Sequence, residues 1–309
     1  MASQTLVEAQ KFINNLIVQG VAQDIISLNP MYNLLPFTPY TGQAMLINRE
    51  ATLGDAAVYA VDATITAKTP STYTQTPYTA VAIIGDAELN GLVRAQSVSA
   101  GVDQMMVEVS QKAKSVARVF QQGMATGAGT AGTLNSYHSL CDATQYTTAS
   151  AGQVLSMALL DELLALVVAK DGQVDFITMP SRTLNSYRQL CRALGGVTIE
   201  SVKLADDRIV DSYMGIPIFR NDYLSVVEQS NGSSLTGGAL TSVYAGVFDD
   251  GTEKVGLTAI HPAAFTAGID VEVIGKMEQR DAEIVRVKQY VQTVVCNRRG
   301  LARLPSISN

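Results

Sequence analysis

Residues 97–124 carry the pattern that most constrains how this chain can fold. Apolar side chains recur there at spacings of three and four residues, which places them on one side of a helix. At 1.5 Å per residue such a helix would be roughly 40 Å long, more than twice the length of a typical globular helix. A long helix with one apolar side must lie on an equally long surface. The stripe consists of Val98, Val102, Met105, Val109, Ala113, Val116 and Phe120.

The surface that suits this helix lies near the end of the chain. Residues 269–273 alternate between aliphatic and acidic side chains, and four valines between 285 and 295 share one parity. Arg286 and Lys288 occupy the opposite parity of the second stretch. This alternation is typical of half-buried strands. We therefore predict two long strands whose apolar face supports the long helix.

The composition indicates that much of the surface does not simply face water. The chain has 309 residues, of which 47% are hydrophobic and only 16% are charged. The usual charged share is about a quarter. A net charge of −6 argues against a general nucleic-acid-binding protein. Residues 276–303 nevertheless hold seven basic and three acidic side chains. We interpret this excess as a solvated face, with a weak approach to packaged nucleic acid as the alternative.

The cysteines and the first residues bear on where the chain is made. Cys141, Cys191 and Cys296 are widely scattered and odd in number. We therefore expect reduced, buried thiols rather than a disulfide framework. The first twelve residues contain no apolar signal-peptide core, and the chain has no run of 18 apolar residues. We expect a soluble protein that is made in the cytosol and does not span a membrane.

The N-terminal region is predicted to be a helix followed by an extended arm. Residues 5–28 have a broad apolar stripe, and Asn29-Pro30 ends the helix because the residue before proline disfavours helical backbone. Aromatic side chains then follow between further prolines. This arm could fold back on its own subunit or reach a neighbour. The stripe consists of Leu6, Ala9, Phe12, Ile13, Leu16, Ile17 and Val21.

Residues 44–84 are rich in Thr, Tyr, Val and Ala and predict a long hairpin. We place its loop near residues 68–77 and a short helical turn after it, at residues 86–92. The hairpin has few large apolar side chains on either face. A two-stranded ribbon without a core is marginal alone, and the rest of the chain offers it no obvious seat. This points to contact with another subunit.

The middle block alternates helices and strands like a compact α/β or α+β domain. A helix-on-sheet unit, built from residues 86–150 and 261–309, surrounds it in sequence. We therefore predict that the block is inserted into that unit. Its predicted helices span 155–169 and 180–194, and its predicted strands span 174–179, 208–213, 216–220, 243–249 and 254–260.

Motifs that carry chemistry are few. Residues 127–132 match G-x-G-x-x-G, but a helix precedes them where the dinucleotide fingerprint requires a strand, so a Gly-rich connector is the better interpretation. His138 and Cys141 stand three apart and could form a base and a nucleophile. Residues 249–251 (DDG) resemble a tight turn more than a calcium loop. We predict no catalytic, cofactor-binding or metal site.

The order of these parts resembles the Hong Kong 97-type major capsid proteins of tailed bacteriophages. The resemblance implies an α+β capsid fold with an N-terminal arm (1–43) and an E-loop hairpin (44–85). It further implies a P-domain with a spine helix (86–150), an inserted A-domain (151–260) and terminal P-domain strands (261–309). Stretches that look alike are Ile47-Asn48-Arg49-Glu50, residues 120–129 (FQQGMATGAG), residues 214–218 (MGIPI) followed by Asn221-Asp222, residues 243–256 (VYAGVFDDGTEKVG), and the basic terminal strands running to Leu304.

This resemblance implies a major capsid protein that assembles, as hexamers and pentamers, into an icosahedral shell around a phage genome. The expected location is the virion capsid, after synthesis in the cytoplasm of a bacterial host. The expected partners are copies of itself, a portal, and double-stranded DNA enclosed without sequence-specific binding. Only about forty residues precede the hairpin, so any scaffolding protein should be separate. The alternatives are an encapsulin-like nanocompartment shell that encloses a cargo enzyme and, less favoured, a soluble Cys/His enzyme.

Some family members link an E-loop lysine covalently to an asparagine of a neighbour. Lys68 lies in the hairpin, but no matching asparagine is evident, so we expect shells held by non-covalent contacts. The candidate inter-subunit contacts are Phe12, Leu16, Phe37, Tyr40, Arg49, Glu50, Lys68, Tyr73 and Tyr78.

Overall fold

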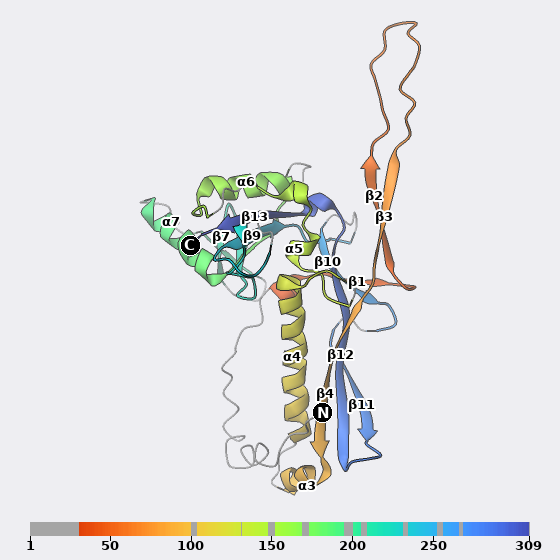
Figure 1. Cartoon of the computed structure of the whole chain (residues 1–309), viewed down its shortest axis with the longest axis vertical. Coiled ribbons are helices and arrows are strands. Elements are labelled where there is room, and N and C mark those ends of the chain that lie inside the picture. Colours follow the sequence, from red (N-terminus) through yellow and green to blue (C-terminus); the bar gives the residue numbers. More distant parts are fainter. Residues whose placement is uncertain are drawn as a thin grey trace.

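A computed structural model describes residues 31–99, 104–130, 132–147, 152–168, 173–194, 200–204, 209–230, 234–251, 256–265 and 268–308. Figure 1 shows three parts: a long helix beside long strands, a lobe with two helices, and a hairpin that projects away from both. The predicted helix at 5–28, with Phe12 and Leu16, lies outside the described residues.

The elements follow one another from the arm to the C-terminal strand. The helices are α2 (Met31–Leu34), α3 (Gly91–Ser99), α4 (Gln104–Thr126), α5 (Tyr137–Leu140), α6 (Met157–Val168) and α7 (Ser181–Ala193), with 3₁₀ turns η1 (Ala143–Gln145) and η3 (Arg298–Gly300). The strands are β1 (Phe37–Tyr40), β2 (Met45–Thr52), β3 (Thr72–Tyr78), β4 (Val81–Asn90), β5 (Phe176–Met179), β6 (Ser201–Lys203), β7 (Ile209–Tyr213), β8 (Ile216–Arg220), β9 (Thr241–Gly246), β10 (Leu257–Pro262), β11 (Asp270–Lys276), β12 (Ala282–Val295) and β13 (Leu301–Ile307).

The first sheet supports the long helix, as the periodicity predicted. Its order is β1-β10-β12-β11, and β4 also pairs with β12, antiparallel, over ten residue pairs. Val116 and Phe120 of α4 share a buried cluster with Val287 and Val291 of β12. The apolar stripe of the helix and the single-parity valines of the strand therefore meet, and their burial stabilises this unit.

Two local predictions in this unit are wrong. Residues 86–90 continue β4 rather than forming a helical turn, because Ala87 and Leu89 alternate with Asp86 and Glu88 and face the helix layer. Residues 91–99 form the separate helix α3, so the described long helix begins at Gln104 rather than at 97. In residues 86–90, apolar and acidic side chains alternate with a period of two, and this pattern indicates a strand although the composition alone suggested a helical turn.

The second sheet forms the lobe and has the order β13-β9-β5-β8-β7-β6. One face packs against α6 and α7: Leu160 and Leu163 of α6 and Tyr187 of α7 share a buried cluster with Ile177 and Val243 of the sheet. The helices and most strands predicted for the middle block are confirmed, with β6 as an additional short strand.

Two strands belong to a different sheet from the one expected when the chain was divided at residue 260. β10, predicted within the inserted block, lies in the first sheet between β1 and β12. β13, predicted among the terminal strands of the helix-on-sheet unit, pairs antiparallel with β9 in the lobe. The chain therefore crosses between the two sheets after β9 and again after β12.

The arm after residue 30 folds back on its own subunit, one of the two predicted outcomes. β1 pairs parallel with β10, with Phe37 opposite Ala259 and Tyr40 opposite Pro262. Phe37 packs against the main core cluster. Phe37 and Tyr40 thus lie on the edge strand of the first sheet.

Candidate assembly surfaces

The hairpin is anchored to the body at its root. Met45 and Ile47 of β2 are buried in a cluster with Ile260, Val294 and Cys296 of the first sheet. Alternate residues of β2 are exposed, as expected for a strand with one covered face. The root therefore does have a seat on its own chain, contrary to the expectation from the sequence.

Arg49 fastens this root through three hydrogen bonds. Its guanidinium donates to the carbonyl oxygens of Val295 (2.5 Å) and Cys296 (3.1 Å) and to the hydroxyl of Tyr78 (3.2 Å). Hydrogen bonds from a charged donor are stronger than neutral ones. Arg49 therefore ties both hairpin strands to the end of β12.

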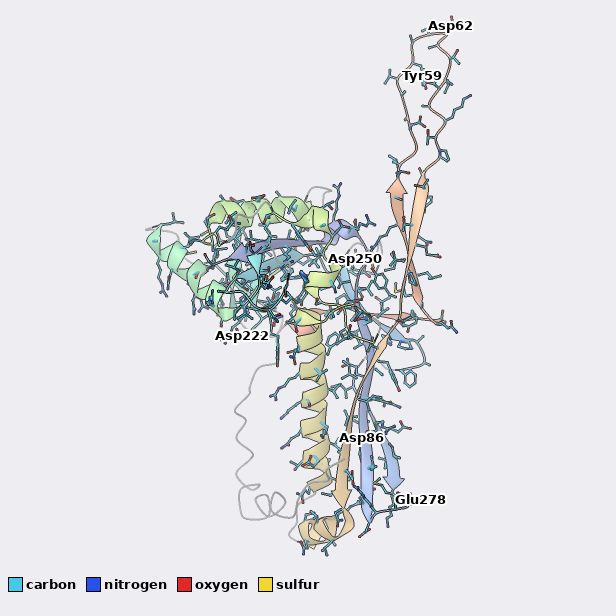
Figure 2. All side chains as sticks on the ribbon, viewed as in Figure 1. Tyr59, Asp62, Asp86, Asp222, Asp250 and Glu278 are labelled. Carbon is cyan, nitrogen blue, oxygen red and sulfur yellow. The ribbon has the colours of Figure 1, made fainter. Side chains whose placement is uncertain are left out.

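Beyond the root, the hairpin has no cover from its own chain among the described residues. Hydrogen bonds within the loop at 53–71 hold its two sides together. The Asp55 carboxylate accepts from the Thr69 amide at 2.5 Å, and the Tyr59 hydroxyl accepts from the amides of Thr66 (2.8 Å) and Ala67 (2.6 Å). Figure 2 shows Tyr59 and Asp62 at the far end of the projection. Large apolar side chains exposed here are Leu46, Leu53, Val58, Val61, Ile65 and Tyr73.

These exposed side chains make the hairpin a candidate docking element. Val58 and Val61 are almost completely exposed, at 102% and 95% of their reference areas. Contiguous exposed apolar surface typically marks an interaction site. The two free edges of a two-stranded ribbon add unpaired backbone groups that another chain can satisfy.

The predicted contact residues fall into three groups. Glu50, Lys68 and Tyr73 are exposed on the hairpin. Arg49 and Tyr78 are half-buried at its root, where they bond to each other and to the body. Phe37 and Tyr40 are half-buried on β1 and pack against the body's own clusters. No partner chain is present, so the contacts between subunits stay a prediction.

The basic side chains of β12 are neutralised by a ladder of ion pairs across three strands. Arg286 binds Asp86 of β4 with two hydrogen bonds of 2.8 and 3.0 Å, and Lys288 contacts Glu272 of β11 at 2.6 Å. The hydrogen bond from Arg286 lowers the pKa of Asp86. Figure 2 labels Asp86 on this face. This favours the predicted solvated face over a surface for nucleic acid.

Arg303 of β13 is the most deeply buried charge that the structure describes. Its side chain is 0% exposed and donates to Glu228 at 3.0 Å, to the Ser242 hydroxyl at 3.0 Å and to Nδ1 of His138 at 2.5 Å. The Ser242 hydroxyl also donates to Glu228. A buried charge is tolerated only when it is paired and hydrogen-bonded, and Arg303 fulfils both conditions.

The environment of His138 and Cys141 does not suit nucleophilic catalysis. Burial and the neighbouring charge of Arg303 lower the pKa of His138 to about 4. Burial raises the pKa of the Cys141 thiol to about 12. The thiol faces the carbonyl oxygen of Leu301 at 3.6 Å, while the imidazole accepts from Arg303. A nucleophile needs an ionised or base-activated thiol, and this arrangement provides neither.

The other motifs lie in structural positions. The glycines at 127–132 follow α4 directly and form a tight connector, in which the Gly127 amide bonds to Gly123 and the Gly129 amide to Leu134. A Cβ atom on Gly127 would come within 2.1 Å of the Leu134 carbonyl oxygen. Within the described ranges, no group of three His, Cys, Asp or Glu side chains could hold a metal ion. None of the described helices is long and apolar enough to cross a membrane.

No protein-family model and no curated protein matches this chain. Solved structures do. The SrpI encapsulin of Synechococcus elongatus PCC 7942 is 15% identical, with a TM-score of 0.67 over 100% of this chain and 97% of that chain. The capsid of a native GTA particle is 13% identical (TM-score 0.63), and the phage G gp27 major capsid protein is 12% identical (TM-score 0.62). Both of these alignments cover 100% of each chain.

These similarities define a class of protein. At such low identity they establish the fold, and the fold extends over the full length of the matched shell proteins. The chain therefore has the α+β fold of Hong Kong 97-type capsid and encapsulin subunits. The assignments of the projecting hairpin as the E-loop, of α4 as the spine helix and of the lobe as the A-domain stay predictions.

Sequence reasoning missed the Arg303 cluster. Arg303 and Glu228 are 75 residues apart, and neither lies in a recognisable motif. The basic excess of the C-terminal region was the only signal, and it pointed to a solvated face. Arg303 instead lies in a strand of which all seven residues are buried.

Proposed function

We propose that this chain is the major capsid protein of a tailed bacteriophage and assembles into an icosahedral shell around the phage genome. One observation carries the proposal: a chain with the fold of a capsid subunit extends a hairpin whose apolar tip is not covered by its own described residues. A second copy of the chain would provide that cover. The low charged share of the sequence fits a subunit enclosed by neighbours.

The proposal includes the finer assignments that follow from a shell. Subunits would associate as hexamers and pentamers through non-covalent contacts and would enclose double-stranded DNA without reading its sequence. A portal and a separate scaffolding protein would complete assembly. The ladder of ion pairs on β12 supports an absence of sequence-specific DNA contact, because Arg286 and Lys288 already have acidic partners.

The test shortens the hairpin at its neck. Asp55 and Thr69 are bridged by hydrogen bonds, so residues 56–68 can be replaced by Gly-Asn with little strain. We expect circular dichroism and thermal unfolding close to wild type, with loss of closed particles in negative-stain microscopy. Each lost contact is small but repeats around every capsomer, so the effect on assembly is multiplied. Normal shells from the shortened chain would refute the assignment.

A matched control changes a surface loop that lies elsewhere in the subunit. Residues 234–237 form a surface turn of the lobe, where Thr236 and Ser234 bond only locally. Replacing Ser234 and Thr236 by glycine should leave both folding and assembly unchanged. Loss of assembly in this control as well would show that assembly is generally fragile and would remove the support from the hairpin experiment.

The second candidate function is an encapsulin-like nanocompartment. It is favoured by the TM-score of 0.67 to the SrpI encapsulin over nearly the whole of both chains. The contents of particles purified from the native source distinguish the two functions. Nuclease-protected genomic DNA supports the phage capsid, whereas a stoichiometric cargo protein without DNA supports the nanocompartment.

A further inference from the structure

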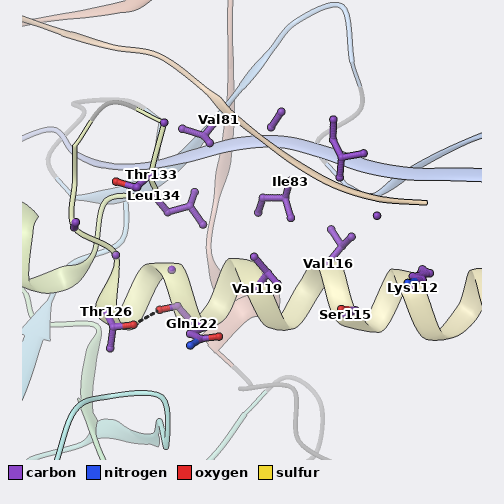
Figure 3. Close-up of a pocket in the computed structure, with 17 residues that line it drawn as sticks. Val81, Ile83, Lys112, Ser115, Val116, Val119, Gln122, Thr126, Thr133 and Leu134 are labelled. Carbon is purple, nitrogen blue, oxygen red and sulfur yellow. Dashed lines mark hydrogen bonds between the residues drawn. The ribbon is translucent and has the colours of Figure 1, made fainter. Parts of the chain in front are cut away.

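An apolar groove runs between α4 and β4 (Figure 3). Its volume is about 630 Å³, and its walls include Ile83, Val116, Val119, Thr126 and Leu134. Val119 is 48% exposed although it lies on the central helix of the subunit. β4 pairs with β12 along one edge, and no described strand pairs with its other edge. The groove therefore exposes apolar surface that a further segment would cover.

The segment that fits is the first part of this chain. Residues 1–30 contain only three charged side chains: Glu8, Lys11 and Asp24. The apolar stripe at 5–28 is broad and has polar residues such as Lys11 and Asn15 on its opposite side. An amphipathic helix with so few charges is stable only when its apolar side is covered.

The described chain begins beside the groove. Met31 is 0% exposed, and its sulfur accepts a hydrogen bond from the Tyr137 hydroxyl at 3.2 Å. It belongs to the same buried cluster as Phe120 and Met124 near the C-terminal end of α4. The groove residues Ile83, Val116 and Leu134 are members of that cluster too. Asn29-Pro30 interrupts the helix at this point, so the chain can change direction there.

We propose that residues 5–28 dock in cis, as an amphipathic helix, into the groove between α4 and β4 of the same subunit. The length is sufficient: 24 residues make a helix of about 36 Å, and the part of α4 that lines the groove, from Lys112 to Thr126, is roughly 22 Å long. The apolar stripe would lie against Val119 and Ile83, with Gln122 and Lys112 at the polar rim. Phe12 and Leu16 would then contact their own subunit, whereas the sequence analysis placed them between subunits.

A disulfide scan of the full-length chain tests this docking. Val119→Cys is combined in turn with Phe12→Cys, Ile13→Cys, Leu16→Cys or Ile17→Cys, and the matched controls place the cysteine at Lys11 or Asn15. The native cysteines are buried and do not compete. We expect rapid oxidation for at least one stripe position, seen as a shifted monomer band on non-reducing denaturing gels. The two control positions should not react.

Three results of the scan would overturn the proposal. Equal reaction of stripe and control positions would indicate an unspecific contact. Dimer bands in place of a shifted monomer would show that the groove is filled by the arm of a second copy. An absence of reaction at every position would show that residues 5–28 lie elsewhere.

Thiol protection gives an independent measurement on the full chain. Maleimide should label Val119→Cys about tenfold faster when Phe12→Asp and Leu16→Asp release the segment, because docking then no longer shields the thiol. Asn15→Asp is the matched control and should not change the rate. Ile209→Cys, exposed on the lobe, should label equally in all backgrounds. Protection of Val119→Cys that survives the two aspartates would assign the groove to a different occupant and refute the proposal.

Discussion

The two antiparallel ribbons of this subunit, β4–β12 and β2–β3, differ in what covers their faces. β4–β12 carries α4 on one face, and residues such as Val287 and Val291 are completely buried beneath it. β2–β3 is covered only at its root, and Tyr73 near the other end is 70% exposed. β4–β12 pairs in one unbroken register, and β2–β3 stays paired along its length with a single register shift, between Glu50 and Thr52. Strand pairing therefore does not require a core on the same chain.

This contrast separates two functions of a strand pair in a shell subunit. The covered ribbon supplies the folding free energy, because its apolar area is removed from water within one chain. The uncovered ribbon contributes little to the subunit and retains its apolar tip for a neighbour. Mutations in the two ribbons should therefore have opposite consequences for subunit stability and for assembly.

The largest effect on subunit stability is expected where α4 covers β4–β12. Phe120 of α4 is 0% exposed in the cluster that it shares with Val287 and Val291 of β12, so Phe120→Ala should lower the free energy of unfolding by about 3–5 kcal/mol. Urea denaturation followed by circular dichroism measures the loss. Tyr73→Ala in the uncovered ribbon is the matched control and should stay within about 0.5 kcal/mol of wild type. Equal losses would remove the distinction between the ribbons.

A loss of similar size is expected at the buried ion pair of the lobe. Glu228→Ala leaves Arg303 without its carboxylate in a site where both side chains are at most 1% exposed, which should cost about 3–5 kcal/mol. Arg280→Ala removes a surface pair with Glu88 and should cost at most about 1 kcal/mol. Chemical denaturation of both variants measures the two losses of unfolding free energy. Comparable denaturation midpoints would show that the buried pair contributes no more to stability than the surface pair.

A smaller, pH-dependent effect is expected from His138. Its pKa is about 4 in the folded chain and about 6.5 when unfolded, so below pH 6.5 the unfolded chain binds a proton that the folded chain does not. The free energy of unfolding therefore falls as the pH drops from 6.5 towards 4. Between pH 7 and 5 this residue should account for about 1–2 kcal/mol of the loss.

Comparison with His138→Gln isolates this contribution from the titrating carboxylates. The variant should lose less stability than wild type between pH 7 and 5, while its particles at pH 7 look normal. An unchanged pH dependence would contradict the buried, neutral state of His138.

The most local effect is expected at the root of the hairpin. Arg49→Ala removes three hydrogen bonds in a half-buried setting and should cost about 1–2 kcal/mol locally. Hydrogen exchange should accelerate in β2 and β3 and remain unchanged in β12. Arg49→Lys keeps the charge but lacks the planar fork, so it should recover only part of the protection. Equal acceleration in β12 would show that Arg49 stabilises the body rather than the hairpin.

The sequence by itself determined the elements with strong periodicity. The stripe ending at Phe120 predicted α4, the valines at 285–295 predicted β12, and the Thr- and Tyr-rich stretch predicted the hairpin. These predictions succeeded because a repeat of 3.6 or 2 residues directly reports which side of an element is buried. The order of the parts was then sufficient to suggest the capsid fold.

Tertiary structure alone decided which strands pair and which charges are buried. β10 and β13 have similar local patterns, yet one joins the first sheet and the other joins the lobe. Arg303 looks like any basic surface residue until Glu228, Ser242 and His138 converge on it. Strand partners and buried ion pairs depend on residues far apart in the chain, and a local pattern contains no information about which distant segment will supply them.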